Sequence, residues 1–212
     1  MNLKNGDKDK GEGSNKKNDR NWLERLSKSN DFVHEHTSLK DEAPFWISYY
    51  RTLISSDILH QDVLPYLNEH LSLEELKSRI PVQEIIFTRD DDKIIQNILN
   101  GSLAIQKHQD DKEFLLINIA NNKFRDVGLA TVESSALGPQ SGFIEELDTN
   151  INLIRKRLPI PELLVKEMKV GELSKTRVAV LYMDGIADPE NVNTVIQRIK
   201  DIQYDHIQDS SY

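Results

Sequence analysis

One pattern of apolar residues occurs twice in this sequence, at a constant offset of 133 positions and without a gap. In each copy, a segment with the composition of a β-strand is followed by a segment with helical spacing of its apolar residues. A further strand candidate precedes each copy, at 32–36 and at 164–168. Five residue pairs carry the match: Tyr49 with Tyr182, Leu53 with Ile186, Leu59 with Val192, Val63 with Ile196, and Tyr66 with Ile199. The repeat therefore predicts two lobes with related strand–strand–helix cores.

The order of the remaining segments suggests how the chain divides. Residues 1–21 are mostly polar and charged, which predicts a disordered tail with too little apolar surface to fold. We expect a first lobe at 22–80 and a second, larger lobe at 81–212, because the second also contains a predicted hairpin at 102–120 and a long helix. The fold class is α/β, with a mixed sheet in each lobe. A cleft between the lobes would favour ligand binding at their junction, and two lobes would serve equally well as a rigid coupling element.

The composition argues against several classes of function. The net charge of the 212 residues is -8, whereas nucleic-acid binding needs a basic face that displaces counterions from phosphates. The chain has no cysteine, which excludes disulfides, thiolate nucleophiles and cysteine-ligated zinc. Its longest apolar runs, such as 115–117, are far shorter than the roughly 20 residues that span a bilayer. We therefore expect the chain, as given, to be soluble and not to bind nucleic acid.

The candidate motifs for chemistry are weak. His34 and His36 share one face of a predicted strand, but two ligands do not complete a zinc site. Asp90–Asp92 lacks the spacing of a calcium loop and is better explained as an acidic helix start. The loop Gly138–Gly142 could hold an anion on the backbone amides of the following helix, but ordinary helix capping is the better explanation, because every helix start needs its free amides satisfied. The sequence has no GxSxG elbow and no dinucleotide-binding loop. It therefore predicts no catalytic, cofactor-binding or metal-binding residues, and a protein that is not an enzyme.

The segment 143–158 is the clearest predicted helix. Acidic residues lie near its start, and Arg155, Lys156 and Arg157 lie near its end, which complements the helix dipole. One apolar stripe runs along it: Phe143, Ile144, Leu147, Ile151, Ile154 and Leu158. We expect this stripe to be buried and the charged face to be available to partners.

The same region carries a resemblance to a known family. Residues 138–147 read GPQSGFIEEL and residues 149–158 read TNINLIRKRL. These segments resemble the GPxxGFxE…TNIxLIRxR signature of the GerA family, the A subunits of bacterial spore germinant receptors. The later segment 176–187, TRVAVLYMDGIA, is also similar to the family pattern. The resemblance implies a coupling or interaction role for eight motif residues: Gly138, Pro139, Gly142, Phe143, Glu145, Asn150, Arg155 and Arg157.

The resemblance implies a larger protein of the spore inner membrane, with an N-terminal domain that faces the cytosol and a C-terminal domain of several membrane spans. It implies partnership with a membrane B subunit and a lipoprotein C subunit, and a response to nutrients that is linked to ion release. We therefore expect a receptor domain that senses or couples a germination signal. A domain that holds the nutrient itself in the cleft between the lobes is the alternative, and a small-molecule enzyme in the same cleft is the rival from another class.

Overall fold

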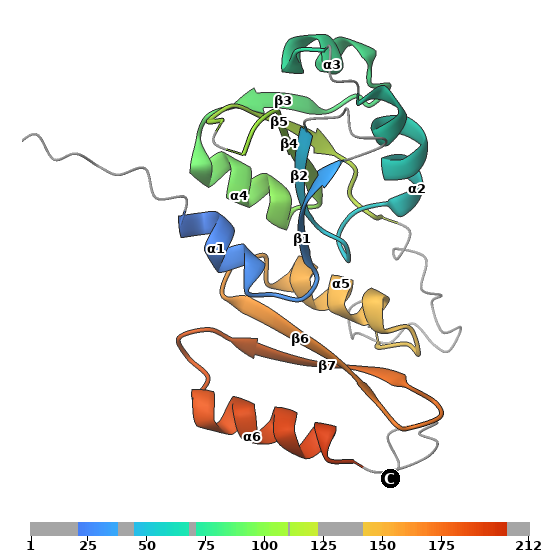
Figure 1. Ribbon diagram of the computed structural model, residues 1–212, viewed down its shortest axis with the longest axis vertical. Helices are drawn as coiled ribbons and strands as arrows, with labels where there is room; N and C mark the ends of the chain where they lie inside the picture. Colours follow the sequence, from blue (N-terminus) through green and yellow to red (C-terminus); the bar gives the residue numbers. More distant parts are fainter. Residues whose placement is uncertain (1–20, 38–44, 68–70, 110, 123–141, 203–212) are drawn as a thin grey trace, which may run out of the picture.

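The computed structural model describes residues 21–37, 45–67, 71–109, 111–122 and 142–202 of the chain. The described strands form two separate sheets, one of five strands and one of two. Figure 1 shows them as layers, with helix α5 between the two sheets and helix α6 beneath the smaller one. The α/β class and the presence of two sheets are therefore as the sequence predicted.

The larger sheet has the strand order β1-β2-β4-β5-β3, and each neighbouring pair is antiparallel. Its strands are β1 (Phe32–Thr37), β2 (Phe45–Tyr50), β3 (Ile85–Thr88), β4 (Ser102–Gln106) and β5 (Phe114–Asn118). Four helices accompany it: α1 (Asn21–Ser27), α2 (Ser56–Ile58), α3 (Leu73–Arg79) and α4 (Asp91–Leu99). Separate clusters of buried side chains lie on its two faces, because α2 and α3 pack on one face while α1 and α4 pack on the other.

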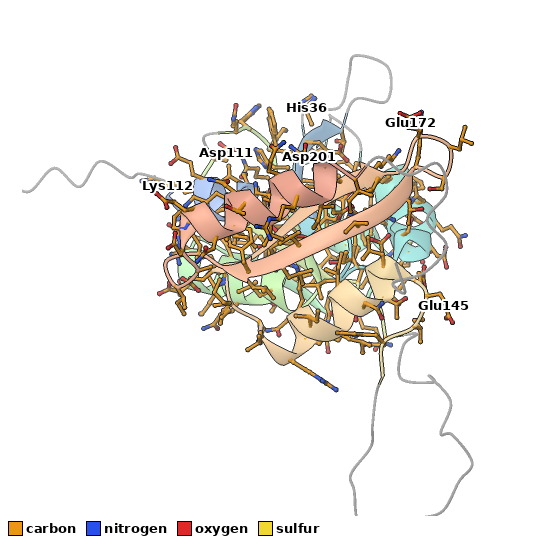
Figure 2. All side chains as sticks on the ribbon, turned by 90° about the horizontal axis from the view of Figure 1, so that it is seen from below. His36, Asp111, Lys112, Glu145, Glu172 and Asp201 are labelled. Carbon is orange, nitrogen blue, oxygen red and sulfur yellow. The ribbon has the colours of Figure 1, made fainter. Side chains whose placement is uncertain are left out.

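The smaller sheet pairs β6 (Leu163–Val170) with β7 (Thr176–Met183) in antiparallel register. Helix α5 (Leu147–Arg157) precedes this hairpin in the chain, and α6 (Pro189–Lys200) follows it. Figure 2, seen from below, shows α6 lying across the hairpin, on the face opposite α5. Within the described residues, no helix combines the length and the apolar composition that crossing a bilayer requires.

Local sequence signals explain where the helices begin and end. Ser72 and Glu75 form the capping box expected at the start of α3. The side chain of Asp90 accepts hydrogen bonds from the first amides of α4, so the acidic triplet there is a helix start. At the end of α4, Gly101 adopts a φ of +90°, a conformation that glycine reaches without strain. After α2, the chain continues through a wider π turn at Leu59–Val63 and then a tighter 3₁₀ turn at Leu64–Tyr66, which contains Pro65.

The predicted repeat is present in the structure. In both copies, an antiparallel pair of strands is followed by a helix: β1, β2 and α2 in the first, and β6, β7 and α6 in the second. The two helices start at equivalent positions, because their N-cap residues Ser55 and Asp188 are separated by the same offset of 133. The related strand–strand–helix cores are therefore confirmed.

The strands are divided between the sheets differently from the prediction. The hairpin assigned to a lobe at 81–212 is β4 and β5, and it joins the sheet of β1 and β2 instead. The larger sheet consequently belongs to the N-terminal part, and its pairs are antiparallel rather than mixed. The reason is burial: all five residues of β4 are buried, so this strand needs a neighbour on each side and cover on both faces. Of the tail predicted at 1–21, residues 1–20 lie outside the described residues.

Candidate functional site

Helix α5 lies between the two sheets, and three of its four buried residues are polar. Its buried residues are Thr149, Ile151, Asn152 and Arg155. Buried polar groups are stable only when they are hydrogen-bonded, so their partners reveal what this helix holds together.

We call the contact region between the two sheets, which α5 occupies, the junction. Arg155 lies at its centre, with only 1 % of its surface exposed. Its Nε donates to Oδ2 of Asp31 at 2.6 Å, and its Nη2 donates to Oδ1 of the same carboxylate at 2.7 Å. Nη2 also lies 2.8 Å from Oγ of Ser29, and Nη1 donates to the carbonyl of Leu163 at 3.3 Å. The guanidinium carbon lies 4.0 Å from the ring centre of Tyr50, within range of a cation–π contact. One side chain thus contacts the start of β1, the end of β2 and the start of β6.

Asp31 is fully buried, and its carboxylate accepts hydrogen bonds from three neighbouring side chains. Besides Arg155, its carboxylate accepts from the hydroxyls of Ser29 at 2.8 Å and Thr52 at 2.9 Å. Asn152 adds a second tie, since its Nδ2 donates to the carbonyl of Thr52 at 2.6 Å. The charge of Arg155 is therefore neutralised by a bidentate pair whose oxygens are further satisfied, which is the condition for a stable buried ion pair.

A further set of hydrogen bonds joins the loop before β1 to the edge of β6. The amide of Asn30 donates to the carbonyl of Val165 at 2.9 Å, and the amide of Glu167 donates to Oδ1 of Asn30 at 2.9 Å. Oγ of Ser29 accepts from the amide of Val165 at 2.8 Å. The loop before β1 thus hydrogen-bonds to β6 almost as a neighbouring strand would.

Four charged side chains form an ion-pair cluster at the rim of the junction. Arg51, just after β2, pairs with Asp148 at 3.0 Å and with Glu167. Arg177 on β7 pairs with the same two carboxylates, at 2.8 Å and 2.9 Å. Hydrogen bonds from Arg177 hold the pKa of Asp148 below its ordinary value, with Arg51 adding to the effect. This cluster joins α5, both strands of the small sheet and the end of β2.

The described residues of the predicted interaction motif do not lie together in one site. Gly138 and Pro139 lie outside the described residues. Gly142 and Phe143 are exposed, Phe143 by 70 %, and they precede α5 instead of beginning it. Glu145 is also exposed and projects outward in Figure 2.

The remaining three motif residues have different surroundings. Oδ1 of Asn150 accepts a hydrogen bond from the backbone amide of Ile144 at 2.9 Å, and Nδ2 of Asn150 donates to the carbonyl of Ile144 at 2.6 Å. Arg157 is exposed, as predicted, whereas the prediction of an available Arg155 is wrong. The predicted apolar stripe is also mostly wrong, because only Ile151 of its six members is buried. The buried face of α5 is polar because its neighbours present the carboxylate of Asp31 and backbone carbonyls that accept hydrogen bonds from Asn152 and Arg155.

Sequence reasoning missed Asp31, Ser29, Tyr50 and Asn152 as parts of this site. A weak signal existed, since Asn152 and Arg155 are three positions apart and share a helical face with Ile151. Polar residues beside a buried Ile predict a polar core contact, but they do not identify the partner.

The other candidates have structural roles. The ring of His34 stacks on Trp46 at 4.8 Å, and its Nδ1 lies 2.8 Å from Oγ of Ser48. Among the described residues, no group of three potential metal ligands comes together. A shallow depression of about 410 Å³ lies near Asp62, Glu84 and Asn118, away from the junction. The junction itself is occupied by α5.

Comparisons with known proteins agree with the resemblance in the sequence. A family model described as "Bacillus/Clostridium GerA spore germination protein" matches residues 20–212. Spore germination protein GerIA of Bacillus cereus is 44 % identical over 194 residues, covering 91 % of this chain and 29 % of that protein. Spore germination protein GerQA of Bacillus cereus is 38 % identical over 192 residues, covering 90 % of this chain and 38 % of that protein. The chain thus spans about a third of the length of these relatives.

A solved structure has the same fold. It is the crystal structure of the N-terminal domain of the A subunit of the Bacillus megaterium spore germinant receptor GerK3. The TM-score is 0.55 at 19 % sequence identity, and the match covers 86 % of this chain and 69 % of that one. With this fold and a family model that matches nearly its whole length, the chain belongs to the Bacillus/Clostridium GerA family of spore germination proteins.

Proposed function

We propose that this chain is the cytosol-facing N-terminal domain of a germinant receptor A subunit and that it transmits a germination signal. Family membership supports the role in germination, and the fold of the GerK3 domain supports the position at the N-terminus of an A subunit. The chain spans about a third of its relatives, so we place it in a longer protein of the spore inner membrane. Its partners are the membrane half of the same subunit and the receptor B and C subunits.

The observation that carries this proposal is the occupied junction between the sheets. Arg155 bonds to Asp31 beside the large sheet and to Leu163 at the start of the small one. The ion-pair cluster of Arg51, Asp148, Glu167 and Arg177 repeats the connection at the rim. A displacement of one sheet therefore moves the other, which suits a coupling element. Neither a nucleophile nor a metal is needed for that role, so we propose a non-enzymatic domain.

Germination assays with the full-length protein in spores of its host test the coupling. The double variant Arg51→Gln/Arg177→Gln removes the rim cluster but leaves the buried Arg155–Asp31 pair in place. We expect slower nutrient-triggered germination at normal receptor abundance. Arg89→Gln is the matched control, because Arg89 pairs with Glu113 within the large-sheet part alone. Normal germination in the double variant would contradict the coupling role.

The alternative is that this domain holds the nutrient. NMR titration of the chain with amino acids and sugars distinguishes the two. Transmission predicts no saturable shifts at the junction, whereas saturable shifts of Asn152 and Thr52 would favour a ligand held between the sheets.

A further inference from the structure

The two copies of the internal repeat differ in how deeply they are buried. The offset of 133 relates β2, residues 45–50, to residues 178–183 of β7, and five of the six residues of β2 are buried. None of the eight residues of β7 is buried, and neither is any residue of α6. The second copy therefore has an incomplete core in the described part of the chain.

One pair of equivalent residues shows what the second copy lacks. Leu53 follows β2 and is 1 % exposed, whereas Ile186, 133 positions later, is 80 % exposed. Leu53 is buried in a cluster to which α4, β4 and β5 contribute side chains such as Ile98 and Leu116. In the described part of the chain, no element follows α6 that could cover Ile186 in the same way.

The outer edge of β7 shows the same difference. In the first copy, β2 lies between β1 and β4, and its residues 46–48 pair with residues 104–106 of β4. Among the described strands, β7 pairs with β6 alone. Proteins usually guard a free edge with charges or proline, but only Arg177 of β7 is charged and the strand contains no proline. The composition of β7 therefore suits a strand with a neighbour on each side.

The repeat also indicates where the missing elements lie. In the first copy they come after the helix of the repeat, because α4, β4 and β5 span residues 91–118. The same offset of 133 places their counterparts at positions 224–251, which is beyond residue 212. The solved GerK3 domain is long enough to contain such a segment, because the match covers only 69 % of it.

We propose that the segment after residue 212 of the full-length subunit completes the small sheet, with a strand on the outer edge of β7 and a helix over Ile186. The backbone of β7 supplies the pairing, as in other additions of a strand to a sheet edge. A segment of the same polypeptide has a high effective concentration at this edge, so it is favoured over a separate molecule. The proposal rests on the placement of this chain in a longer protein, which is part of the function proposed above.

Hydrogen exchange at β7 tests the pairing. In an antiparallel pair, alternate amides of a strand point away from its neighbour. In the 212-residue chain, the amides of β7 that point away from β6 should exchange fast. In a chain extended by its natural sequence through position 251, their exchange should slow by about tenfold or more. Unchanged fast exchange in the extended chain would overturn the proposal, and so would slow exchange in the 212-residue chain, whether or not it depends on protein concentration.

The variant Ile186→Asp tests the cover over the small sheet. In the 212-residue chain this side chain is 80 % exposed, so the substitution should leave the thermal midpoint unchanged. In the extended chain it should lower the midpoint by several degrees, because a carboxylate would be buried without a partner. Ile86→Asp is the control and should have no effect in either chain, since Ile86 lies on the other sheet and is 47 % exposed. An extended chain that tolerates Ile186→Asp as well as Ile86→Asp would overturn the proposal.

Neither measurement depends on germination, so the two proposals fail separately. Normal germination of Arg51→Gln/Arg177→Gln would contradict signal transmission but would not affect the slow exchange expected at β7. Fast exchange at β7 in the extended chain would contradict the completed sheet but would leave the connection between α5 and the two sheets in place.

Discussion

The guanidinium of Arg155 keeps a full charge where water does not reach. Moving an ion into such a site costs several kcal/mol, and only a well-placed counter-ion offsets that cost. Asp31 supplies two oxygens at 2.6 Å and 2.7 Å, and the hydroxyls of Ser29 and Thr52 satisfy the rest of the carboxylate. Each member of the pair is therefore stable only in the presence of the other.

Replacement of Arg155 by Ala should be strongly destabilising. The change leaves the carboxylate of Asp31 buried without its counter-ion, which typically costs about 3–5 kcal/mol. Arg157→Ala should change the free energy of unfolding by less than about 1 kcal/mol, because Arg157 is exposed. Urea denaturation of the two variants measures the difference. Similar midpoints for both would show that the buried pair contributes little.

The double variant Arg155→Met/Asp31→Leu is the control for this interpretation. It removes both charges together, so it should be more stable than Arg155→Ala. A double variant as unstable as Arg155→Ala would assign the loss to packing rather than to the unpaired charge.

At the scale of elements, α5 was predicted as a helix but with the wrong buried face. Amphipathic spacing marks a helix reliably, yet the rule that apolar residues face inward fails where the neighbouring surface is polar. The Arg155–Asp31 contact joins residues 124 positions apart, so no local pattern in the sequence could indicate it. Helix caps were predictable because they depend on residues close together in the chain, and the repeat was predictable because each copy carries a local pattern of apolar residues.

The same limit explains the misassigned hairpin. The alternation within 102–120 predicts two strands, but a strand pattern does not specify its neighbour. Only the pairing of β4 with β2 shows that the hairpin belongs to the large sheet.

Truncation of Ile151 on α5 should destabilise the fold. This side chain is 1 % exposed, and its replacement by Ala leaves a cavity that typically costs about 2–5 kcal/mol. Phe143→Ala is the comparison, because a side chain that is 70 % exposed should change stability by no more than about 0.5 kcal/mol. Thermal unfolding followed by circular dichroism gives both values. An equal loss for Phe143→Ala would show that this ring is packed in solution.

The turn from α4 into β4 requires glycine at position 101. Its φ is +90°, and a Cβ built there would lie 2.8 Å from Cβ of Ala120 and 2.9 Å from the carbonyl oxygen of Leu53. Gly101→Ala should therefore lower the thermal midpoint by several degrees, through both backbone strain and the clash. The double variant Gly101→Ala/Ala120→Gly relieves the contact with the Ala120 methyl and should recover part of the loss. A midpoint unchanged in Gly101→Ala would mean that the turn adopts another conformation.

For the molecule as a whole, the ion-pair cluster at the rim makes the free energy of unfolding depend on pH. The pKa of Asp148 is lower in the folded state, chiefly through Arg177, so the ionised carboxylate stabilises the fold at neutral pH. That contribution is complete above the unfolded pKa of about 3.9 and is lost as the pH falls through the folded pKa. Asp148→Asn should therefore show a flatter loss of stability below about pH 4 than the parent. If the two proteins lost stability in parallel as the pH fell, the titration of Asp148 would not contribute to the pH dependence of folding.

The distance along the chain between Asp31 and Arg155 also has a consequence for synthesis on the ribosome. The segment that contains Asp31 leaves the exit tunnel long before α5 does, and its carboxylate must stay in water until Arg155 arrives. A stalled nascent chain with residues 1–150 outside the tunnel should remain sensitive to protease near β1, whereas one with β7 also outside should be resistant. The first strands of the domain thus reach their final packing only after α5 and β6 have been made.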